Sequence, residues 1–418
     1  MRFSIGYHGG MRRAFGLDFG TTNSAVACAT AAGVETTPVH RSILYFEPKT
    51  TAVTGNDAID RYLAADEKGR LMQSLKSFLA SRRFTGTNVY GRQYSIEDLL
   101  AIFLRDLRKV AENQFGALNG AIVVGRPVRY SSANDDADNE FAMGRIRSAL
   151  ERAGIGPIEF EFEPVAAAYF YASTLDHDEL IIIGDFGGGT SDFSLLRVGP
   201  HLRTILGTEG VALAGDAFDS RMVRHMVSPL LGLGSEYRSI EKTLPMPVWV
   251  YSDLERWHYL SLLKSTDTIN MLRSIRYHSL EPEKLSALLH VIQNDMGFYL
   301  HRSVQNTKAD LSIQENSIFQ FKDGVVDIEA GLNRNTFEEW IQEELSRIRG
   351  CVDRLLADAG VTPGDIDHVF LTGGSSLVPA VRQIFESIFG AQKLTSGSEF
   401  TSVAQGLALK ALELVDCR

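Results

Sequence analysis

The sequence has few cysteines, and none of them has the spacing of a metal site. Its 418 residues include only three, Cys28, Cys351 and Cys417, which lie far apart and are odd in number. No Cys-x-x-Cys or Cys/His pattern of a zinc module occurs. Disulfide-rich secreted domains and zinc modules are therefore excluded, and the low cysteine content favours a reducing, cytoplasmic compartment.

Long apolar runs and excess positive charge are also absent. No apolar run reaches the roughly 18 residues that a membrane helix requires. The first residues, MRFSIGYHGGMRR, lack the apolar core of a signal peptide, and either Met1 or Met11 could be the start. The net charge is −10, which argues against a nucleic-acid partner because phosphate binding needs a basic face. We expect a cytoplasmic protein with no membrane and no nucleic-acid partner.

The chain has no proline- or serine-rich linker, yet it is too long for one compact core, which indicates two domains or lobes. Apolar strand-like runs alternate with amphipathic helical segments, as in GAIVVGRPV (120–128) followed by a helix ending near Gly154. This alternation predicts an α/β architecture. The polar stretch SSANDDADNE (131–140) between these two elements is expected to be a solvated surface loop.

Two segments about 170 residues apart share one plan, as repeats do. GLDFGTTNSAVA (16–27) and GDFGGGTSDFSLL (184–196) each read as strand, Asp, aromatic residue, glycine turn, hydroxyl, strand. Two hairpins of one design predict two related lobes.

The chemistry of these turns points to phosphate. Backbone N–H groups at a glycine turn bind anions, and threonine hydroxyls add donors. An acid at the strand end repels phosphate unless a divalent cation lies between them, and Mg²⁺ prefers carboxylates, waters and phosphate oxygens. Asp18 and Asp185 are therefore candidate Mg²⁺ ligands, direct or through water. The alternative is that each acid only caps its turn.

Five segments together resemble the actin/sugar-kinase/Hsp70 ATPase superfamily, and most closely the Hsp70 nucleotide-binding domain. They are GLDFGTTNS (16–24), EPVAAAY (163–169), GDFGGGTSDFSLL (184–196), AGDAFDSRMV (214–223) and LTGGSSLVP (371–379). VTGNDA (53–58) and SLKSFLASRRF (74–84) also resemble Hsp70 segments in the right order. Each piece alone is short, but the combination is specific.

The resemblance implies an α/β actin-like ATPase (ribonuclease H-like) fold, with two lobes and a nucleotide cleft between them. Lobe I is expected over 11–180, with an inserted subdomain at about 38–118 and a returning C-terminal helix at 398–418. Lobe II is expected over 181–397, with a mostly helical inserted subdomain at about 224–300. No peptide-binding domain is recognised in this sequence.

The resemblance also implies the roles of single residues toward ATP or ADP and Mg²⁺. The catalytic residues would be Lys76, Glu163, Thr190 and Asp185, and the metal residues Asp18, Asp185 and Asp192. The nucleotide would be bound by Gly20, Thr21, Thr22, Asn23, Gly187, Gly188, Gly189, Thr190, Gly215, Asp216, Lys308, Ser312, Gly373, Gly374 and Ser375. Lys76 could instead be a solvated helical lysine, and Glu163 a turn acid or part of an exposed strand face.

The sequence departs from the family pattern where the adenine ring would lie. Ala309 and Leu377 stand where arginines that sandwich the base are expected, and Gln305 stands at an expected Glu. Arginine stacked on a ring contributes about 0.5–2 kcal/mol. These departures predict weaker or less adenine-specific binding.

The leading functional hypothesis is an Hsp70-like, chaperone-type ATPase that binds Mg-ATP between two lobes and hydrolyses it slowly to open and close them. Its partners would be nucleotide and protein clients or co-chaperones. The alternatives are a nucleotide-weak scaffold or actin-like interaction protein of the same fold, and a small-molecule kinase.

Overall fold

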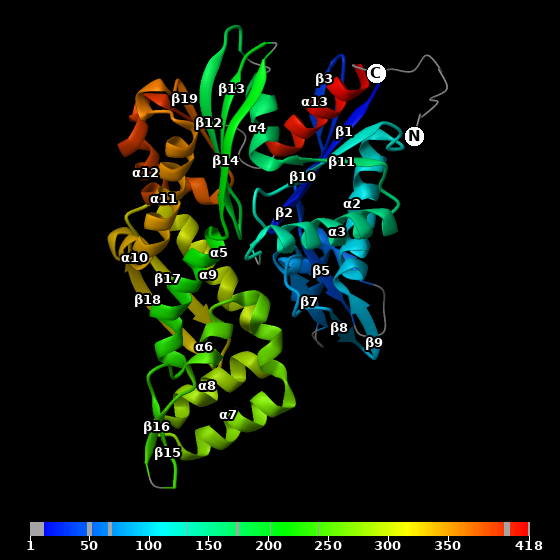
Figure 1. The fold of residues 1–418 in the computed structure, drawn as a ribbon. Helices are drawn as coiled ribbons and strands as arrows, with labels where there is room; N and C mark the ends of the chain where they lie inside the picture. The colour runs from blue at the N-terminus through cyan, green and yellow to red at the C-terminus, as the bar shows by residue number, and fades with distance from the viewer. Residues whose placement is uncertain are drawn as a thin grey trace. The chain divides into compact units, whose positions relative to one another are not determined.

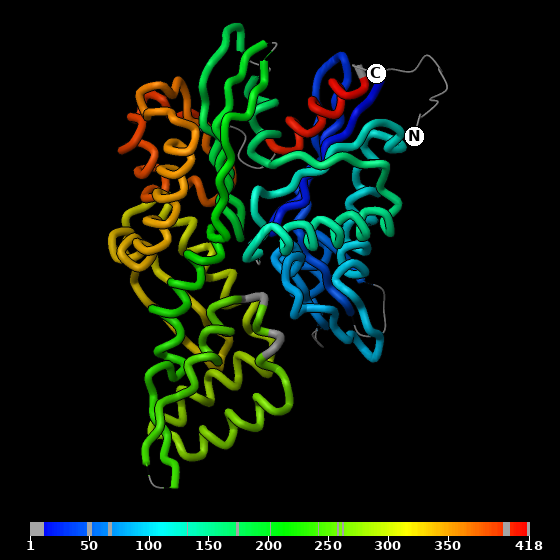
Figure 2. Tube along the Cα trace, viewed as in Figure 1, coloured from blue at the N-terminus to red at the C-terminus, as the bar shows by residue number. Residues whose placement is uncertain are grey.

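The computed structural model describes residues 12–47, 52–65, 69–131, 133–172, 175–200, 202–240, 242–396 and 402–416. Figure 2 traces the backbone in chain order. The possible start residues Met1 and Met11, together with Cys417, lie outside the described residues. The ends of the predicted helix 398–418 also lie outside them, and its described part is helix α13 (Ser402–Asp416).

The chain divides into two compact units. Unit 1 comprises Met1–Ala212, Cys351–Gly374 and Ile388–Arg418, and unit 2 comprises Leu213–Gly350 and Ser375–Ser387. The boundaries expected for the two lobes stay a prediction.

Unit 1 holds two sheets with the same strand order. The first runs β3-β2-β1-β10-β11, and the second runs β14-β13-β12-β19-β20. In each, the central strand pairs antiparallel with the next strand of its hairpin and parallel with a strand from later in the chain. The repeat predicted from the two hairpins therefore extends to the strand order.

The strands of the first sheet are β1 (Ala14–Phe19), β2 (Asn23–Thr30), β3 (Gly33–Thr36), β10 (Ala121–Arg126) and β11 (Ile158–Phe162), with β4 (His40–Arg41) beside β2. Those of the second are β12 (Glu179–Phe186), β13 (Ser191–Val198), β14 (Arg203–Val211), β19 (His368–Thr372) and β20 (Leu394–Ser396).

Two helices, α4 (Glu163–Ala172) and α13, pack on each other and against these sheets. Each directly follows the last strand of its sheet's order, α4 after β11 and α13 after β20, and Figure 1 shows α13 crossing β1 and β10. Their shared core joins small residues of α4 and Leu407 of α13 to branched residues of both sheets, including Val123, Ile181 and Ile183. Gly16 of β1 permits this packing, because a Cβ there would lie 2.2 Å from the carbonyl oxygen of Ala404.

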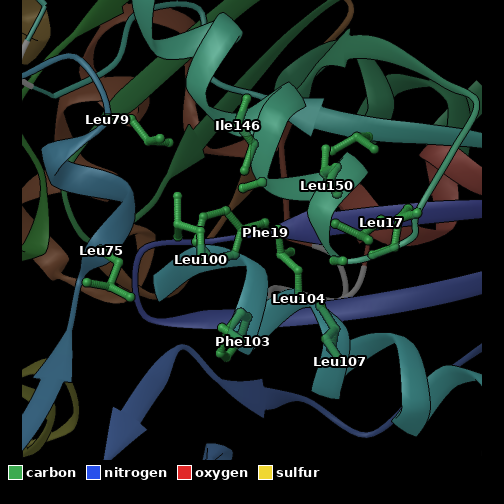
Figure 3. Close-up of a cluster of buried hydrophobic side chains, with 14 of the residues drawn as sticks. Leu17, Phe19, Leu75, Leu79, Leu100, Phe103, Leu104, Leu107, Ile146 and Leu150 are labelled. Carbon is green, nitrogen blue, oxygen red and sulfur yellow. The ribbon is translucent and has the colours of Figure 1, made fainter. Parts of the chain in front are cut away.

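A second core of unit 1 lies between β1, helix α2 (Ile96–Phe115), helix α3 (Asp136–Arg152) and a short 3-10 helix (Leu75–Phe78). Figure 3 shows Leu75 and Leu79 facing the same cluster as Phe19, Leu100 and Ile146. Burial of these side chains fixes the 3-10 helix to the body of unit 1. Smaller elements complete this part: α1 (Gly55–Ala64), β5 (Ile43–Phe46), β6 (Val53–Thr54), β7 (Arg70–Gln73), β8 (Gly86–Val89) and β9 (Arg92–Ser95).

The expected loop at 131–140 is only partly a loop, which corrects the sequence prediction. Helix α3 begins at Asp136, because the Asp135 side chain caps it by accepting a hydrogen bond from the Asp138 N–H at 2.9 Å. Asp138 and Asn139 are buried, and the Asn139 side chain accepts from the backbone N–H of Tyr130. The acidic residues are thus the first turn of a helix, where the helix dipole favours them.

Unit 2 is mostly helical. Its helices are α5 (Gly215–Met222), α6 (Val248–Leu254), α7 (Thr266–His278), α8 (Pro282–Gln293), α9 (Gly297–Ile313) and α10 (Arg334–Trp340). Helices α11 (Gln342–Ala359) and α12 (Pro379–Phe389) each contribute residues to both units. Two hairpins, β15 (Glu236–Arg238) with β16 (Thr243–Pro245) and β17 (Asn316–Lys322) with β18 (Asp327–Asn333), complete unit 2. No helix in the described part of the chain is long and apolar enough to cross a membrane.

Candidate functional site

The first glycine turn joins β1 to β2 and is tightly constrained. A Cβ on Gly20 would lie 2.2 Å from the carbonyl oxygen of Asn23, so only glycine fits there. Ser42 holds the turn from outside: its hydroxyl donates to the carbonyl of Gly20 at 2.8 Å, and its backbone N–H donates to that of Thr22 at 2.9 Å. Thr21 and Thr22 are partly exposed at this turn, which follows Asp18 and Phe19, the last two residues of β1.

Asn23 is already engaged by another side chain. Its side-chain oxygen accepts a hydrogen bond from Arg41 at 3.1 Å, and the two residues are paired between β2 and β4. The sequence-predicted binding residue thus also fixes the edge of the first sheet.

The second glycine turn joins β12 to β13. The backbone N–H of Gly187 donates to the carbonyl of Thr190 at 2.9 Å and closes the turn. Asp185 and Asp192 stand directly opposite each other on the two strands, whereas the residue opposite Asp18 in the first hairpin is Ala25. The second turn therefore brings two carboxylates to the place where the first brings one.

Lys76 and Glu163 form a buried ion pair within unit 1. The Lys76 Nζ lies 2.5 Å from the Glu163 Oε1, and both side chains are less than a tenth exposed. Glu163 begins α4 directly after β11, and Lys76 sits in the 3-10 helix. A solvated lysine and an exposed turn acid are both ruled out by this burial.

The second turn also lies near the 3-10 helix that carries Lys76. A Cβ on Gly189 would lie 3.5 Å from the Ser77 hydroxyl and 3.5 Å from the Cβ of Ser131. The phosphate-type turn and the buried lysine are therefore neighbours in space, although they are more than 100 residues apart in the chain.

The carboxylates of this site are strongly perturbed. Burial, then the charge of Glu163, raises the pKa of Asp18 to about 7, while Lys76 opposes the shift. The same two causes raise the pKa of Asp192 to about 7 and that of Asp185 well above its ordinary value. For Lys76, burial lowers the pKa, but the carboxylates, Glu163 first, outweigh it and raise the pKa overall. One ammonium thus faces several carboxylates, so ionisation of all of them would leave an excess of negative charge in poorly hydrated surroundings, and the raised pKa values reflect this.

Asp192 is held by a loop from the first half of unit 1. Its Oδ1 accepts hydrogen bonds from the backbone N–H groups of Val128 at 2.8 Å and Arg129 at 3.3 Å. Its Oδ2 is buried and accepts no hydrogen bond from the described residues. A buried carboxylate oxygen of this kind needs a cation, a proton or a donor group to be satisfied.

These observations fit a divalent cation held mostly by water and ligand oxygens. Among the described residues, no group of three or more His, Cys, Asp or Glu side chains could hold a metal ion directly. Mg²⁺ commonly keeps several waters and takes only one or two carboxylates. The excess negative charge and the unsatisfied Asp192 oxygen fit such an ion, with Asp18, Asp185 and Asp192 as the residues around it.

Gly373 lies beside the second turn's strand. Its φ is +84°, and a Cβ there would lie 2.1 Å from the carbonyl oxygen of Phe186, the last residue of β12. Only glycine permits this approach. Gly374 begins the short 3-10 helix that follows β19, and Ser375, which belongs to unit 2, is buried.

The remaining predicted residues lie together in unit 2. Lys308 of α9 forms an ion pair with buried Asp219 of α5 at 2.6 Å and donates to the carbonyl of Gly215 at 3.2 Å. Burial, then the charge of Asp219, raises the pKa of Asp216 to about 6. The Ser312 hydroxyl donates to the carbonyl of Lys308 one turn earlier in α9. Four sequence-predicted residues are thus joined through α5 and α9.

The two residues that stand where arginines are expected are both on the surface. Ala309 is exposed on α9, and the Leu377 side chain is 47% exposed. Neither side chain is enclosed by core residues, so a larger side chain would fit at both positions.

Sequence reasoning missed two residues that hold the predicted ones. Asp219 pairs with Lys308, and Arg145 of α3 binds the segment that follows Lys76. The signal for Arg145 was present: it stands on the apolar stripe of α3 between Ala142, Ile146 and Ala149, where a charge needs a specific partner.

Comparison with known proteins places this chain in a family. A family model described as Hsp70 protein matches residues 79–231 and 293–415. The chain is similar to "Chaperone protein DnaK" from Thermosipho melanesiensis (25% identical, covering 95% of this chain and 58% of the relative). The same named protein from Thermus thermophilus is 26% identical over 96% of this chain and 61% of the relative. The chain thus spans about 58–61% of the length of these curated relatives.

Proposed function

Because the chain belongs to the Hsp70 protein family and has its mixed α/β, actin-like ATPase fold, we propose that it binds Mg-ATP and hydrolyses it slowly. Hydrolysis would change the arrangement of the two lobes, a known mode of switching around a ligand. The relatives are named chaperones, and the extension of client or co-chaperone binding to this chain is part of the proposal.

The proposed binding mode follows from the two turns. The backbone N–H groups and hydroxyls at residues 20–22 and 187–190 would bind phosphate oxygens. A bound Mg²⁺ would neutralise charge on those oxygens, close to Asp18, Asp185 and Asp192. In unit 2, residues 215–216, Lys308 and Ser312 would serve the nucleoside end.

The buried Lys76–Glu163 pair carries the proposal of catalysis. Phosphoryl transfer is accelerated mainly by fixed positive charge near the transferred group and by a positioned nucleophile. Lys76 supplies a fixed charge whose raised pKa keeps it protonated, and Glu163 both orients that ammonium and offers an acceptor for an attacking water. The second glycine turn, which includes Thr190, lies beside this ion pair and would hold the γ-phosphate within reach of Lys76.

Single-turnover hydrolysis of Mg-ATP tests this function. We expect slow turnover by the protein as it stands and a loss of about 100- to 1,000-fold in Lys76→Gln, the effect typical of removing one electrostatic donor. Lys322→Gln is the matched control, because Lys322 is a half-exposed lysine on the β17–β18 hairpin of unit 2. Absence of hydrolysis above the Lys76→Gln background would contradict the proposal.

Folding must be checked in the same experiment. Removing one partner of a buried ion pair costs about 3–5 kcal/mol, because the other charge stays buried and unpaired. The double variant Lys76→Gln/Glu163→Gln removes both charges and leaves two side chains that can still hydrogen bond. We expect it to melt closer to the unmodified protein than Lys76→Gln does, yet to remain as inactive.

A scaffold that binds nucleotide weakly is the second candidate, and the exposed Ala309 and Leu377 favour it. Titration calorimetry with ADP and ATP separates the two. Binding of Mg-ADP at micromolar concentration supports the ATPase, whereas no heat and no melting shift at millimolar nucleotide supports the scaffold.

A further inference from the structure

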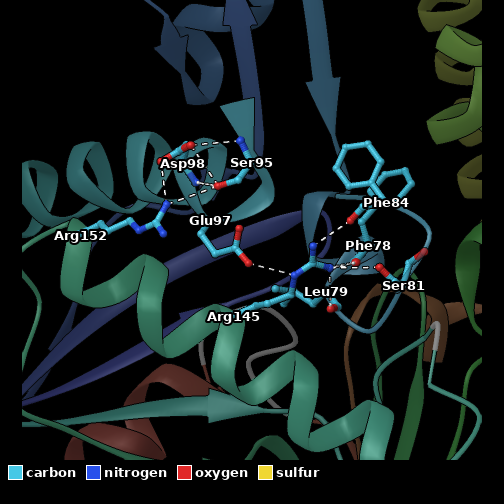
Figure 4. Close-up of polar contacts among 9 residues, drawn as sticks. All are labelled: Phe78, Leu79, Ser81, Phe84, Ser95, Glu97, Asp98, Arg145 and Arg152. Atoms are coloured by element: carbon cyan, nitrogen blue, oxygen red, sulfur yellow. Dashed lines mark hydrogen bonds and ion pairs between the residues drawn. The ribbon is translucent and has the colours of Figure 1, made fainter. Parts of the chain in front are cut away.

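Arg145 of α3 is a buried arginine whose guanidinium is almost wholly used on one segment of backbone. It donates to the carbonyls of Phe78, Leu79 and Ser81 at 3.3, 3.2 and 3.1 Å, and to that of Phe84 at 2.8 Å. Its Nε donates to Glu97 Oε1 at 3.0 Å. Figure 4 shows the guanidinium at the centre of these contacts. An arginine is suited to this task because its planar group presents five donors in a fixed geometry.

The segment that Arg145 holds begins two residues after Lys76. Lys76 lies in the 3-10 helix Leu75–Phe78, and Phe78 is both the end of that helix and the first of the four carbonyl partners. Residues 78–84 form a closed loop, since the rings of Phe78 and Phe84 are 4.7 Å apart. We call residues 78–84 the post-lysine loop.

At the other end, the residue that precedes the 3-10 helix has an unfavourable backbone conformation. Ser74 precedes the helix with φ +49°, in the left-handed region that few residues other than glycine adopt. Such a residue persists only where its surroundings impose it. The fixed post-lysine loop can help to impose it, as can the burial of Leu75 and Leu79 in the core.

A second contact binds the same loop to α3 from the opposite direction. Arg82 of the loop reaches back to Asp138 in the first turn of α3, with Nε 2.8 Å from Oδ1. The guanidinium carbons of Arg82 and Arg145 lie 4.8 and 4.7 Å from the ring centre of Phe141. Arg82 is more than half exposed, whereas Arg145 is buried, so Arg145 is the dominant anchor.

We propose that Arg145 is a positioning residue for Lys76: by binding four carbonyls of the post-lysine loop, it fixes the 3-10 helix that aims the lysine at Glu163. Arg145 itself is not proposed to contact the nucleotide. The kinetic consequence rests on the proposed ATPase function, whereas the placement of Lys76 does not.

A purely structural role would predict a different outcome. Arg145 also ties α3 to α2 through Glu97, next to the exposed pair of Arg152 with Asp98 (Figure 4). If that tie were its only purpose, loss of Arg145 would lower the melting temperature without altering Lys76. Leu150→Ala provides the matched comparison, because Leu150 is wholly buried on the same helix and contacts the same core but not the post-lysine loop's carbonyls.

The direct test is the reactivity of the Lys76 amine toward an amine-specific acylating reagent, followed by mass spectrometry. In the unmodified protein Lys76 should react far more slowly than the exposed Lys322, which serves as the internal reference. We expect Arg145→Gln to raise the relative labelling rate of Lys76 at least 10-fold, and Leu150→Ala to leave it within two-fold. Arg145→Lys keeps the positive charge but not the planar set of five donors. Its relative labelling rate of Lys76 should lie between those of Arg145→Gln and Leu150→Ala. It also replaces Arg145→Gln as the test variant should the latter not fold.

The kinetic test separates the two proposals. A displacement of about 1 Å in a catalytic group costs about 100-fold in rate. We expect Arg145→Gln to slow single-turnover hydrolysis by about that factor, while its dissociation constant for Mg-ADP stays within two-fold of that of the unmodified protein. We expect Leu150→Ala to keep both the hydrolysis rate and this dissociation constant within two-fold. Equal Lys76 labelling in Arg145→Gln and the unmodified protein, or an equal rise in Leu150→Ala, would overturn the inference. Absence of hydrolysis in the unmodified protein would overturn the proposed function alone, because the labelling result still decides the placement of Lys76.

Discussion

Gly406 of α13 lies against the backbone of Ala166 in α4, so closely that a Cβ at residue 406 would stand 1.6 Å from the Ala166 carbonyl oxygen. Both helices follow the last strand of their sheets, and Glu163 begins α4 one turn before this contact. The crossing of α4 and α13 therefore sets the position of the residue that pairs with Lys76.

Gly406→Ala should destabilise the protein by about 1–3 kcal/mol or more, because overpacking forces the two helices apart. Chemical denaturation measures the change. Gly144→Ala is the control: residue 144 is exposed on α3 with open space around it, so alanine should stabilise the helix by about 0.5–1 kcal/mol. Equal stability of the two variants would show that the helices do not cross as described.

Stability at acidic pH should depend on His301 of α9. Burial lowers the pKa of His301 to about 4, although its hydrogen bond with the Leu254 carbonyl opposes the shift. The unfolded chain binds a proton below about pH 6.5 whereas the folded protein does not, so the free energy of unfolding falls as the pH drops from 6.5 toward 4. Over the whole range, the lowered pKa of His301 accounts for a fall of about 3 kcal/mol in the free energy of unfolding.

Urea unfolding at pH 7 and pH 5 measures this dependence. His301→Gln cannot titrate and should lose less stability between the two values than the unmodified protein does. His278→Gln, at an exposed position, should behave like the unmodified protein. If the free energy of unfolding of His301→Gln fell between pH 7 and pH 5 by as much as that of the unmodified protein, His301 would not be the cause of the pH dependence.

Arginine introduced at the exposed positions 309 and 377 should tighten adenine nucleotide binding. Each stacking contact contributes about 0.5–2 kcal/mol, so the double variant Ala309→Arg/Leu377→Arg should bind ADP about 5-fold tighter or more. Calorimetry with ADP and GDP measures affinity and base preference. Leu280→Arg, at a position 50% exposed in unit 2, should change neither.

Nucleotide binding should depend on Mg²⁺ through Asp18. The excess negative charge around Lys76 repels phosphate until a divalent cation offsets it. Removing Mg²⁺ with a chelator should weaken ADP binding about 10-fold or more, the scale of one lost metal-mediated contact. Asp18→Asn should show a smaller Mg²⁺ dependence, and Asp57→Asn, at an exposed site on α1, an unaltered one. Equal ADP affinity with and without Mg²⁺ would exclude the proposed role.

Local patterns in the sequence predicted the fold well. The two hairpins are visible as strand, glycine turn and strand. Ser95 and Asp98 cap α2 through reciprocal hydrogen bonds, which a serine three residues before an acid at a helix start indicates. The family match and the mixed sheets confirm the predicted α/β, actin-like ATPase fold class. The prediction of a loop over 131–140 was wrong from Asp136 onward, because acidic residues favour both loops and the first turn of a helix.

The site was less predictable because its contacts are distant in the chain. Lys76 and Glu163 are 87 residues apart, and without the family resemblance either could have been an ordinary surface residue. The four carbonyls that Arg145 binds carry no sequence signal, since every residue has one. The closeness of Gly406 to Ala166 likewise depends on how two helices cross.

We propose that the turns at 20–22 and 187–190 bind the phosphates of one nucleotide beside the Lys76–Glu163 pair. A crystal structure of the protein with Mg-ADP would test this binding mode. We expect the β-phosphate in contact with backbone N–H groups of both turns, with the metal ion beside Asp18 and Asp185. Nucleotide bound elsewhere, or in contact with only one turn, would contradict it.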